Sequence, residues 1–411
     1  MIKFDRFILE NGLKVIVHND TSTTMVAVNI LYNVGARDES PDMTGFAHLF
    51  EHLMFEGSKN IPSFDTPLQL AGGENNAYTT NDITNYYITI PKENLETAFW
   101  LESDRMLSLG FSQKKLDIQK SVVIEEYNQR YLNQPYGDAH LYLRPLAYKV
   151  HPYQWATIGK DISHIQNANL ENVKDFFEHH YAPNSAILSV AGNITKEEIE
   201  SLAIKWFGPI KRKEIAERNL PKEPKQTSKR TLKLERNVPF DAIYKAFHMS
   251  SRHNSDYNVA DLISDLLSNG KSSRLYQQLV KEKQFFSSID AYITGDIDEG
   301  LFIISGNIMK GISIDTAEAA IENELKKIYT DKIDDYELNK VKNKFESVHQ
   351  FGQLSAMNKA MDLAYQELLG DANLINHEVE NYRNVSANDI KRVASQLFDA
   401  NNCSTLYYIA K

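Results

Sequence analysis

The sequence predicts an α+β protein made of two homologous domains, each a largely antiparallel β-sheet packed with helices. Three observations support this fold class. The chain has 411 residues, which is enough for two domains of ordinary size. Strand-like and helical runs follow one another in mixed order, with hairpin signals such as the Asn81-Asp82 turn within residues 76–90, and without the regular alternation that builds a parallel sheet. The two halves also repeat one order of segments.

Matching strands and helices in the two halves indicate a duplication. The apolar run over residues 25–34 reads as a strand in the first half, and residues 242–249 are its counterpart in the second. In each half an Ala-Asn pair then opens an amphipathic helix that leads into an apolar strand, over residues 168–191 and 387–409. We therefore expect the two domains to share one topology.

The segment from Lys211 to Arg230 predicts the boundary between the domains. It contains two prolines and eight Lys or Arg residues but few apolar ones, so it cannot bury enough surface to fold alone. We expect one domain over residues 1–212, a linker over 213–230 and a similar second domain over 231–411.

Composition excludes several classes of function. Acidic residues outnumber basic ones by 55 to 45, a formal charge of −10, which argues against nucleic acid as a partner. No run of about 18 apolar residues occurs, so we expect no membrane span. The first residues lack an apolar signal segment, which makes the cytoplasm the default compartment, or the periplasm if the N-terminus was trimmed.

The metal chemistry available to the chain is limited by its single cysteine. Cys403 cannot form a disulfide within the chain, and one thiol excludes a multi-cysteine metal or iron–sulfur site. Any bound metal must therefore be held by His, Asp or Glu.

The most informative segment for function runs from Thr44 to Gly57. We expect a helix with Thr44 as its N-cap and Gly57 as its C-terminal stop. His48, Glu51 and His52 are three and four residues apart, so they share one face of that helix. This is the order H-x-x-E-H, the inverted form of the common zinc-protease motif.

The residue types in this motif suit hydrolysis. Two neutral imidazoles one turn apart can bind one Zn²⁺, which lowers the pKa of its water to about 7. A nearby carboxylate that is not a ligand can take the proton and pass it to a leaving amine. We predict His48 and His52 as ligands and Glu51 as the base. On its own the pattern also fits a helix with two surface histidines, so it needs a third ligand and a wider context.

That context comes from motifs on both sides of the helix. They are Asn11-Gly12-Leu13-Lys14-Val15, Gly35-Ala36-Arg37-Asp38-Glu39, Glu56-Gly57-Ser58, Gly72-Gly73-x-x-Asn76-Ala77-Tyr78-Thr79 and Asp82-x-Thr84-x-Tyr86. With them the first half resembles the pitrilysin/insulinase family of zinc peptidases, in the branch of mitochondrial processing peptidase and its bacterial relatives. The resemblance extends more weakly over the whole chain.

The resemblance implies a third ligand in the run Val122 to Glu126. By the family pattern Glu126 is the ligand, which gives one Zn²⁺ per chain held by two histidines and a glutamate, and Glu125 is the alternative. Many relatives carry another Glu seven residues earlier, where this chain has Gln119. A neutral amide can still hydrogen-bond a metal ligand but adds no charge.

The resemblance also implies how a peptide binds. Family members add the substrate as a strand to an exposed sheet edge, which here corresponds to Asn76, Ala77 and Tyr78. The Asn76 side chain would hold a substrate carbonyl. The alternative is that Asn76 is only a turn residue after Gly72-Gly73.

The second half of the chain departs from the family pattern at two residues that contact the substrate carbonyl in relatives. Relatives supply an Arg and a Tyr that grip the substrate carbonyl and stabilise the oxyanion. These positions read Lys281 and Ser288 here, and Tyr292 lies four residues further. Family members close a clamshell of four such domains. This chain supplies about half of it, a zinc-binding catalytic domain over 1–212 and a second domain without a metal over 231–411. We therefore expect a heterodimer with a same-fold subunit that carries the Arg/Tyr pair, or else a homodimer.

The predicted function is that of a zinc-dependent endopeptidase. It would hydrolyse peptides or unfolded segments inside a closed chamber, as the catalytic subunit of a dimer. The main alternative is a non-catalytic structural or regulatory subunit of the same fold. A metal hydrolase for non-peptide substrates has no support beyond the metal motif itself.

Overall fold

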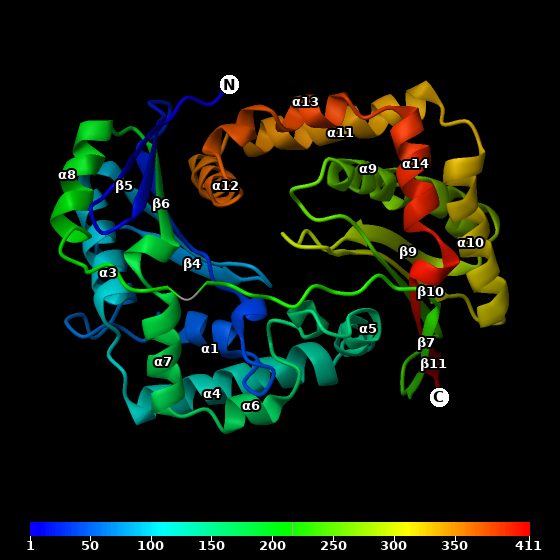
Figure 1. The fold of residues 1–411 in the computed structure, drawn as a ribbon, viewed down its shortest axis with the longest axis horizontal. Helices are drawn as coiled ribbons and strands as arrows, with labels where there is room; N and C mark the ends of the chain where they lie inside the picture. Colours follow the sequence, from blue (N-terminus) through cyan, green and yellow to red (C-terminus); the bar gives the residue numbers. More distant parts are fainter. Residues whose placement is uncertain (216) are drawn as a thin grey trace. The chain divides into compact units, whose positions relative to one another are not determined.

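The protein forms two compact units in a computed structural model that describes residues 1–215 and 217–411 (Figure 1). Unit 1 comprises Met1–Tyr127, Trp155–Leu220 and His349–His377. Unit 2 comprises Asn128–Gln154, Pro221–Val348 and Glu378–Lys411. Each unit therefore takes one segment from the other half of the sequence.

Unit 1 is built on a six-stranded sheet with the order β1-β2-β6-β3-β5-β4. Its strands are β1 (Asp5–Ile8), β2 (Lys14–Asn19), β3 (Met25–Tyr32), β4 (Glu74–Thr79), β5 (Thr84–Pro91) and β6 (Ala186–Gly192). Strands β2 and β6 run parallel, and the other neighbours are antiparallel. Strand β4 ends the sheet on one side. The strands and the hairpin expected from the sequence are present within a few residues.

Helices cover both faces of this sheet. They are α1 (Phe46–Leu53), α2 (Asp65–Leu70), α3 (Leu95–Leu107), α4 (Gln113–Tyr127), α6 (Ile162–Gln166), α7 (Leu170–His180), α8 (Lys196–Trp206) and α12 (Ala356–Leu368). Helix α12 packs on β3 and β6, whereas α3 and α8 lie on the other side of the sheet (Figure 1). Ala27, Ala191 and Ala360 meet where α12 crosses the sheet, because small side chains let the helix approach closely.

Unit 2 repeats this topology. Its strands are β7 (Arg230–Arg236), β8 (Ala242–His248), β9 (Phe286–Ile293), β10 (Leu301–Ile308) and β11 (Cys403–Ala410), in the order β7-β11-β8-β10-β9. Here β7 and β11 are the parallel pair. The order matches β2-β6-β3-β5-β4 of unit 1 strand for strand, which confirms the predicted fold class of two homologous, largely antiparallel domains.

The remaining helices complete unit 2 and the connections. They are α5 (Ala139–Ala147), α9 (Asp256–Ser268), α10 (Ile314–Thr330), α11 (Asp335–Gly352), α13 (Glu378–Arg383) and α14 (Ala387–Leu397). Short 3₁₀ or π segments are η1 (Ala36–Asp38), η2 (Lys92–Asn94), η3 (Asn128–Leu132), η4 (Pro152–Gln154), η5 (Pro183–Ser185), η6 (Tyr276–Glu282), η7 (Ala372–Asn376) and η8 (Ala400–Asn402). Across residues 1–215 and 217–411, every helix is too short or too polar to cross a bilayer.

The two halves exchange one helix each. Helix α5 belongs to the first half of the sequence but packs on β8 and β11 of unit 2, through Leu143 and its neighbours. Helix α12 belongs to the second half but packs on the sheet of unit 1. The compact units therefore cut across the sequence ranges 1–212 and 231–411.

Part of the segment read as a linker is packed into unit 2. The buried Glu223 carboxylate accepts hydrogen bonds from the backbone N–H groups of residues 149–151 at 2.8–3.0 Å. The buried Gln226 amide donates to the Cys403 carbonyl at 2.8 Å. These polar side chains are satisfied in the fold, which anchors the chain from residue 221 onward. Residue 216, within the same segment, lies outside the described residues.

Candidate metal centre

Helix α1 is fixed at its start by a buried carboxylate. Glu39 accepts hydrogen bonds from the backbone N–H groups of Gly45 and Ala47 at 2.9 and 2.8 Å. Burial is the main cause that raises the pKa of Glu39 to about 8. Gly45 has φ +87°, and a Cβ atom there would lie 2.7 Å from the Ile158 carbonyl oxygen, so only glycine fits.

The prediction of Thr44 as the N-cap is wrong. Gly45 is the N-cap of α1, and Glu39 satisfies the first N–H groups in place of a local side chain. The Thr44 hydroxyl contacts His164 Nδ1 at 2.9 Å and accepts a hydrogen bond from the Lys160 N–H at 2.9 Å. A capping carboxylate six residues away cannot be recognised from the rule for adjacent residues.

The apolar side of α1 packs into the core, which leaves the histidines on the opposite face of the helix. Phe46, Leu49, Phe50 and Leu53 are buried, and the Phe50 ring lies 4.4 Å from that of Tyr181 between centroids. Because helical neighbours at three and four residues share a face, the opposite side presents His48, Glu51 and His52. The predicted stop at Gly57 is too late: α1 ends at Leu53 with Met54 as its C-cap, and Gly57, with φ +91°, lies in the turn beyond it.

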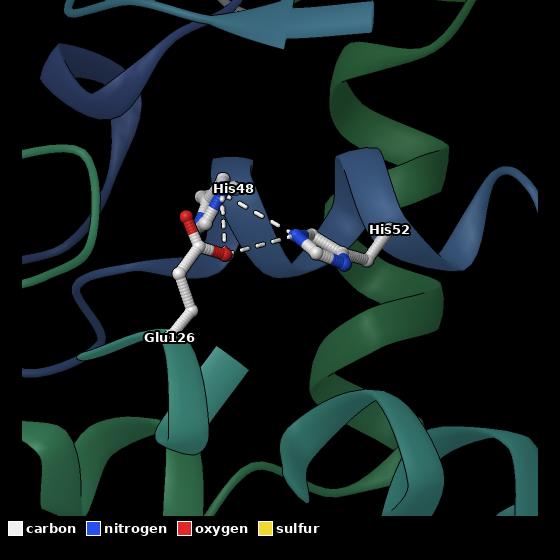
Figure 2. Close-up of side chains that lie close together, drawn as sticks. All are labelled: His48, His52 and Glu126. Carbon is white, nitrogen blue, oxygen red and sulfur yellow. Dashed lines mark hydrogen bonds and ion pairs between the residues drawn. The ribbon is translucent and has the colours of Figure 1, made fainter. Parts of the chain in front are cut away.

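The structure brings the His48, His52 and Glu126 side chains together (Figure 2). His48 Nε2 and His52 Nε2 are 3.4 Å apart, and Glu126 Oε2 lies 3.6 Å from the first and 3.5 Å from the second. The side chains are 13%, 23% and 17% exposed, so the cluster is accessible from solvent. Glu125, the alternative to Glu126, is exposed and lies outside this cluster.

These separations fit a tetrahedral metal ion. Nitrogen and oxygen ligands about 2.0–2.2 Å from a tetrahedral Zn²⁺ lie about 3.4 Å from one another. The three measured distances, 3.4–3.6 Å, agree with that geometry without movement of the chain. Two imidazoles and one carboxylate are also a donor set that zinc takes in catalytic sites.

Glu51 is held by the edge strand of the sheet. The Thr79 hydroxyl, at the end of β4, donates a hydrogen bond to Glu51 Oε2 at 2.5 Å. This contact fixes the carboxylate beside the cluster without making it a member of it. Thr79 belongs to the motif Asn76 to Thr79. The sequence nevertheless gives no signal that a hydroxyl on this strand contacts Glu51 on helix α1.

Strand β4 carries the residues predicted to bind substrate. Asn76, Ala77 and Tyr78 pair with β5 on one side, opposite Tyr87, Tyr86 and Asn85 respectively. The Asn76 Oδ1 atom accepts the Ala77 N–H at 2.8 Å. The amide nitrogen is the donor of this side chain, so it is the atom that could meet a carbonyl oxygen.

Helix α4 delivers Glu126 to the cluster, and polar contacts tie this helix to the end of α1. Gln119 donates a hydrogen bond to the Glu56 carboxylate. Lys115 Nζ donates to the Glu56 carbonyl oxygen at 2.5 Å. The partner of Gln119 is therefore Glu56, which lies outside the cluster, and not one of the expected metal ligands. Sequence analysis gave no role to Lys115 and named Glu39, Glu56 and Thr79 only as motif residues, because all four act through contacts between separate elements.

The residues at the positions of the family's Arg and Tyr, and the nearby Tyr292, lie in unit 2. Lys281 is exposed in η6, and Ser288 is exposed on β9, where its hydroxyl accepts from Asn307 at 3.2 Å. The Tyr292 hydroxyl lies 3.0 Å from His140 Nε2. Burial lowers the pKa of His140 to about 4, so its ring is neutral near pH 7 and shares a hydrogen bond with the Tyr292 hydroxyl.

Comparison with known proteins gives matches along most of the chain. The family model described as Insulinase (Peptidase family M16) matches residues 14–157, and that described as Peptidase M16 inactive domain matches residues 167–345. The zinc protease PqqE of Helicobacter pylori is 29% identical over 413 residues, which cover 98% of this chain and 92% of that protein. An uncharacterized zinc protease of Bacillus subtilis, YmxG, is 25% identical over 402 residues, covering 97% and 96%.

Solved structures agree in fold. The crystal structure of a protease from Helicobacter pylori has a TM-score of 0.93 and 29% identity, over 99% of this chain and 100% of that one. Pitrilysin has a TM-score of 0.79 and 18% identity, over 100% of this chain and 45% of its own. Because models of one family match both halves and the relatives align over nearly their full length, the chain belongs to the insulinase family of peptidases, family M16, as its motifs indicated.

Proposed function

We propose that the chain is a zinc-dependent endopeptidase that binds one Zn²⁺ through His48, His52 and Glu126. The observation that supports this most strongly is the spacing of the three ligand atoms, 3.4–3.6 Å, which suits a tetrahedral ion. The relatives named zinc proteases lend further support. Three protein ligands leave a fourth position for water or substrate, as in catalytic zinc sites.

Glu51 is the proposed general base. When bound, zinc supplies Lewis acidity, which polarises a peptide carbonyl and makes water a stronger acid. Glu51 takes the proton of the attacking water and passes it to the leaving amine. The Thr79 hydroxyl holds one of its oxygens at 2.5 Å, so the carboxylate is oriented before substrate arrives.

Strand β4 is the proposed site of substrate binding. A peptide would join the sheet as an added strand beside Asn76, Ala77 and Tyr78, because β4 ends the sheet order. Main-chain hydrogen bonds to an added strand do not depend on sequence, which suits peptides or unfolded segments. Thr79 belongs to the same strand, so the bound peptide and Glu51 share one support.

A same-fold partner is the proposed route to a closed chamber. The oxyanion contacts would come from a subunit that carries an Arg/Tyr pair, or from a second copy of this chain. The exposed Lys281 and Ser288 support this, since neither offers the phenol that the grip requires.

Exchange of Glu51 tests the proposed chemistry. Glu51→Gln should lower hydrolysis of a quenched fluorescent peptide by about 10²–10⁴-fold, because a neutral amide cannot accept the proton. Zinc content should stay near that of wild type, since Glu51 is outside the ligand cluster. A chelator should abolish wild-type activity and added zinc should restore it, with the candidate partner present in all arms. Wild-type rates from Glu51→Gln would exclude it as the base.

The alternative is a non-catalytic structural or regulatory subunit. The description of the second family model as an inactive domain concerns residues 167–345, which do not include His48, Glu51, His52 or Glu126. Metal content separates the two functions. A gently purified chain with well under one zinc ion would favour the regulatory subunit.

A further inference from the structure

One face of helix α4 carries both Glu126 and the residues that attach the helix to α1. Leu116, Gln119, Val123 and Glu126 follow one another at intervals of three and four residues, so they lie along one side of α4. Leu116 and Val123 are 1% and 0% exposed and form the apolar part of this face. Gln119 and Glu126, between and beyond them, are its polar part.

Two polar side chains of α4, Lys115 and Gln119, bind one residue at two points. Lys115 and Gln119 are one helical turn apart, and both reach Glu56, the first at the carbonyl oxygen and the second at the carboxylate. Glu56 follows α1 directly, and its own N–H donates to the Leu53 carbonyl at 3.1 Å. The Lys115 ammonium therefore sits at the C-terminal end of the helix that carries both histidines, where a positive charge is favourable.

Apolar packing alone would not place Glu126 accurately enough. Contacts of Leu116 and Val123 are non-directional, and they tolerate small slides of α4 along its axis. A step of one residue along a helix is about 1.5 Å, whereas metal–ligand distances must hold within about 0.2 Å. Two directional contacts at Glu56, made by Gln119 and Lys115 about 10 and 16 Å from Glu126 along the helix axis, can set that position.

We propose that Glu56, Gln119 and Lys115 form a positioning clamp that sets the axial register of α4 and thereby presents Glu126 to the zinc site. The clamp rests on the proposed function, since it positions a ligand of the proposed metal. None of its three residues belongs to the ligand cluster. Its effect reaches the site through the backbone of α4, and it should appear first in metal affinity.

Zinc affinity of the full chain tests the clamp, measured by competition with a chromophoric chelator. Gln119→Ala removes the donor to Glu56 and should weaken zinc binding by about 10-fold, the lower end of effects seen for outer-shell residues. The double variant Glu56→Lys/Gln119→Glu replaces the hydrogen bond by an ion pair and should restore affinity close to wild type. Absorption of the Co²⁺-substituted proteins reports the same changes in ligand geometry.

A matched control lies on the same helix. Ser121 is exposed on α4, away from the Leu116 and Val123 face, so Ser121→Glu changes the helix without touching the clamp. Its zinc affinity should not fall. The thermal midpoint of each metal-free variant verifies that the fold is intact.

The outcomes are distinguishable from those of the proposed function. If wild type fails to hold zinc, the metal assignment itself is wrong. If wild type binds zinc tightly and Gln119→Ala binds it equally well, the clamp is wrong while the zinc site stands. The clamp is also overturned if the ion-pair variant does not recover affinity, or if Ser121→Glu loses as much as Gln119→Ala.

Discussion

The hydrogen bond from Thr79 to Glu51 couples two residues that have different tasks in the proposed reaction. Glu51 belongs to helix α1, and Thr79 ends the strand beside which a peptide would lie. The 2.5 Å contact restricts the carboxylate to one orientation. A hydrogen bond to a charged group contributes about 1.5–3 kcal/mol, so its loss should be measurable in the rate.

Replacement of the Thr79 hydroxyl should therefore slow catalysis. Thr79→Val keeps the shape of the side chain and should lower kcat about 10-fold, since Glu51 would populate unproductive orientations. Zinc content should be unchanged because Thr79 is outside the ligand cluster. Thr79→Ser retains the donor and serves as the control. Equal kcat values for the valine and serine variants would show that the hydroxyl has no part in orienting Glu51.

Among single residues, the sequence predicts the site residues that lie close together in the chain. The spacing of His48, Glu51 and His52 places them on one helical face, and the structure presents them there. Glu126 comes from the family resemblance, because spacing alone gives no reason to select it from a distant helix. Thr79 and Glu56 act through contacts between separate elements, which single-sequence patterns do not encode.

Helix α1 is an eight-residue element that depends on its two ends. Glu39 holds its first N–H groups, and left-handed glycines precede and follow it. Short helices are marginal without tertiary support, so these ends matter for the whole site. The sequence predicts both ends inaccurately: it places the C-terminal stop at Gly57, whereas α1 ends at Leu53, and it assigns the N-cap to Thr44, because capping rules consider only adjacent residues.

The buried Glu39 predicts a pH dependence of stability. Its pKa is raised from 4.5 to about 8 in the folded chain, mainly by burial. The folded state therefore keeps a proton that the unfolded state releases, so the stabilisation is complete below about pH 4.5 and is lost as pH rises through about 8. One pKa unit corresponds to about 1.4 kcal/mol, which makes the loss a few kcal/mol.

Glu39→Gln isolates this contribution because glutamine cannot titrate. Thermal midpoints of the metal-free proteins should be measured from pH 5 to pH 8.5, so that metal release does not contribute. The wild type should lose stability relative to Glu39→Gln across this range. Parallel curves would mean that Glu39 does not hold its proton in the folded chain.

For the whole molecule, the duplication is the feature that the sequence indicates best. The repeated order of segments predicts two sheets of one topology, and both sheets have it. The exchange of α5 and α12 is not visible in the sequence, because either helix reads as an ordinary amphipathic segment of its own half. Only packing decides which sheet its apolar side covers. The first half of the sequence, residues 1–212, thus lacks part of the core of unit 1.

Helix α12 and the segment after it complete the core of unit 1. Their apolar residues pack against side chains of four segments in the first half: Leu363, Ala364, Ala372 and Ile375 meet Ile16, Leu31, Ile83 and Ile187. A fragment of residues 1–220 contains every proposed ligand and all six strands, but it would expose this apolar face. Exposed patches of several hundred Å² favour aggregation over a folded monomer.

We therefore expect the 1–220 fragment to lack a cooperative thermal transition and to bind zinc poorly, although His48, His52 and Glu126 are all present. The matched control is the same fragment joined through a flexible linker to residues 349–377, which restores α12 and should recover both properties. In the full chain, Leu363→Ala should cost about 2–5 kcal/mol, because Leu363 is fully buried. A sharp transition and tight zinc binding from residues 1–220 alone would show that the first half folds without the exchanged helix.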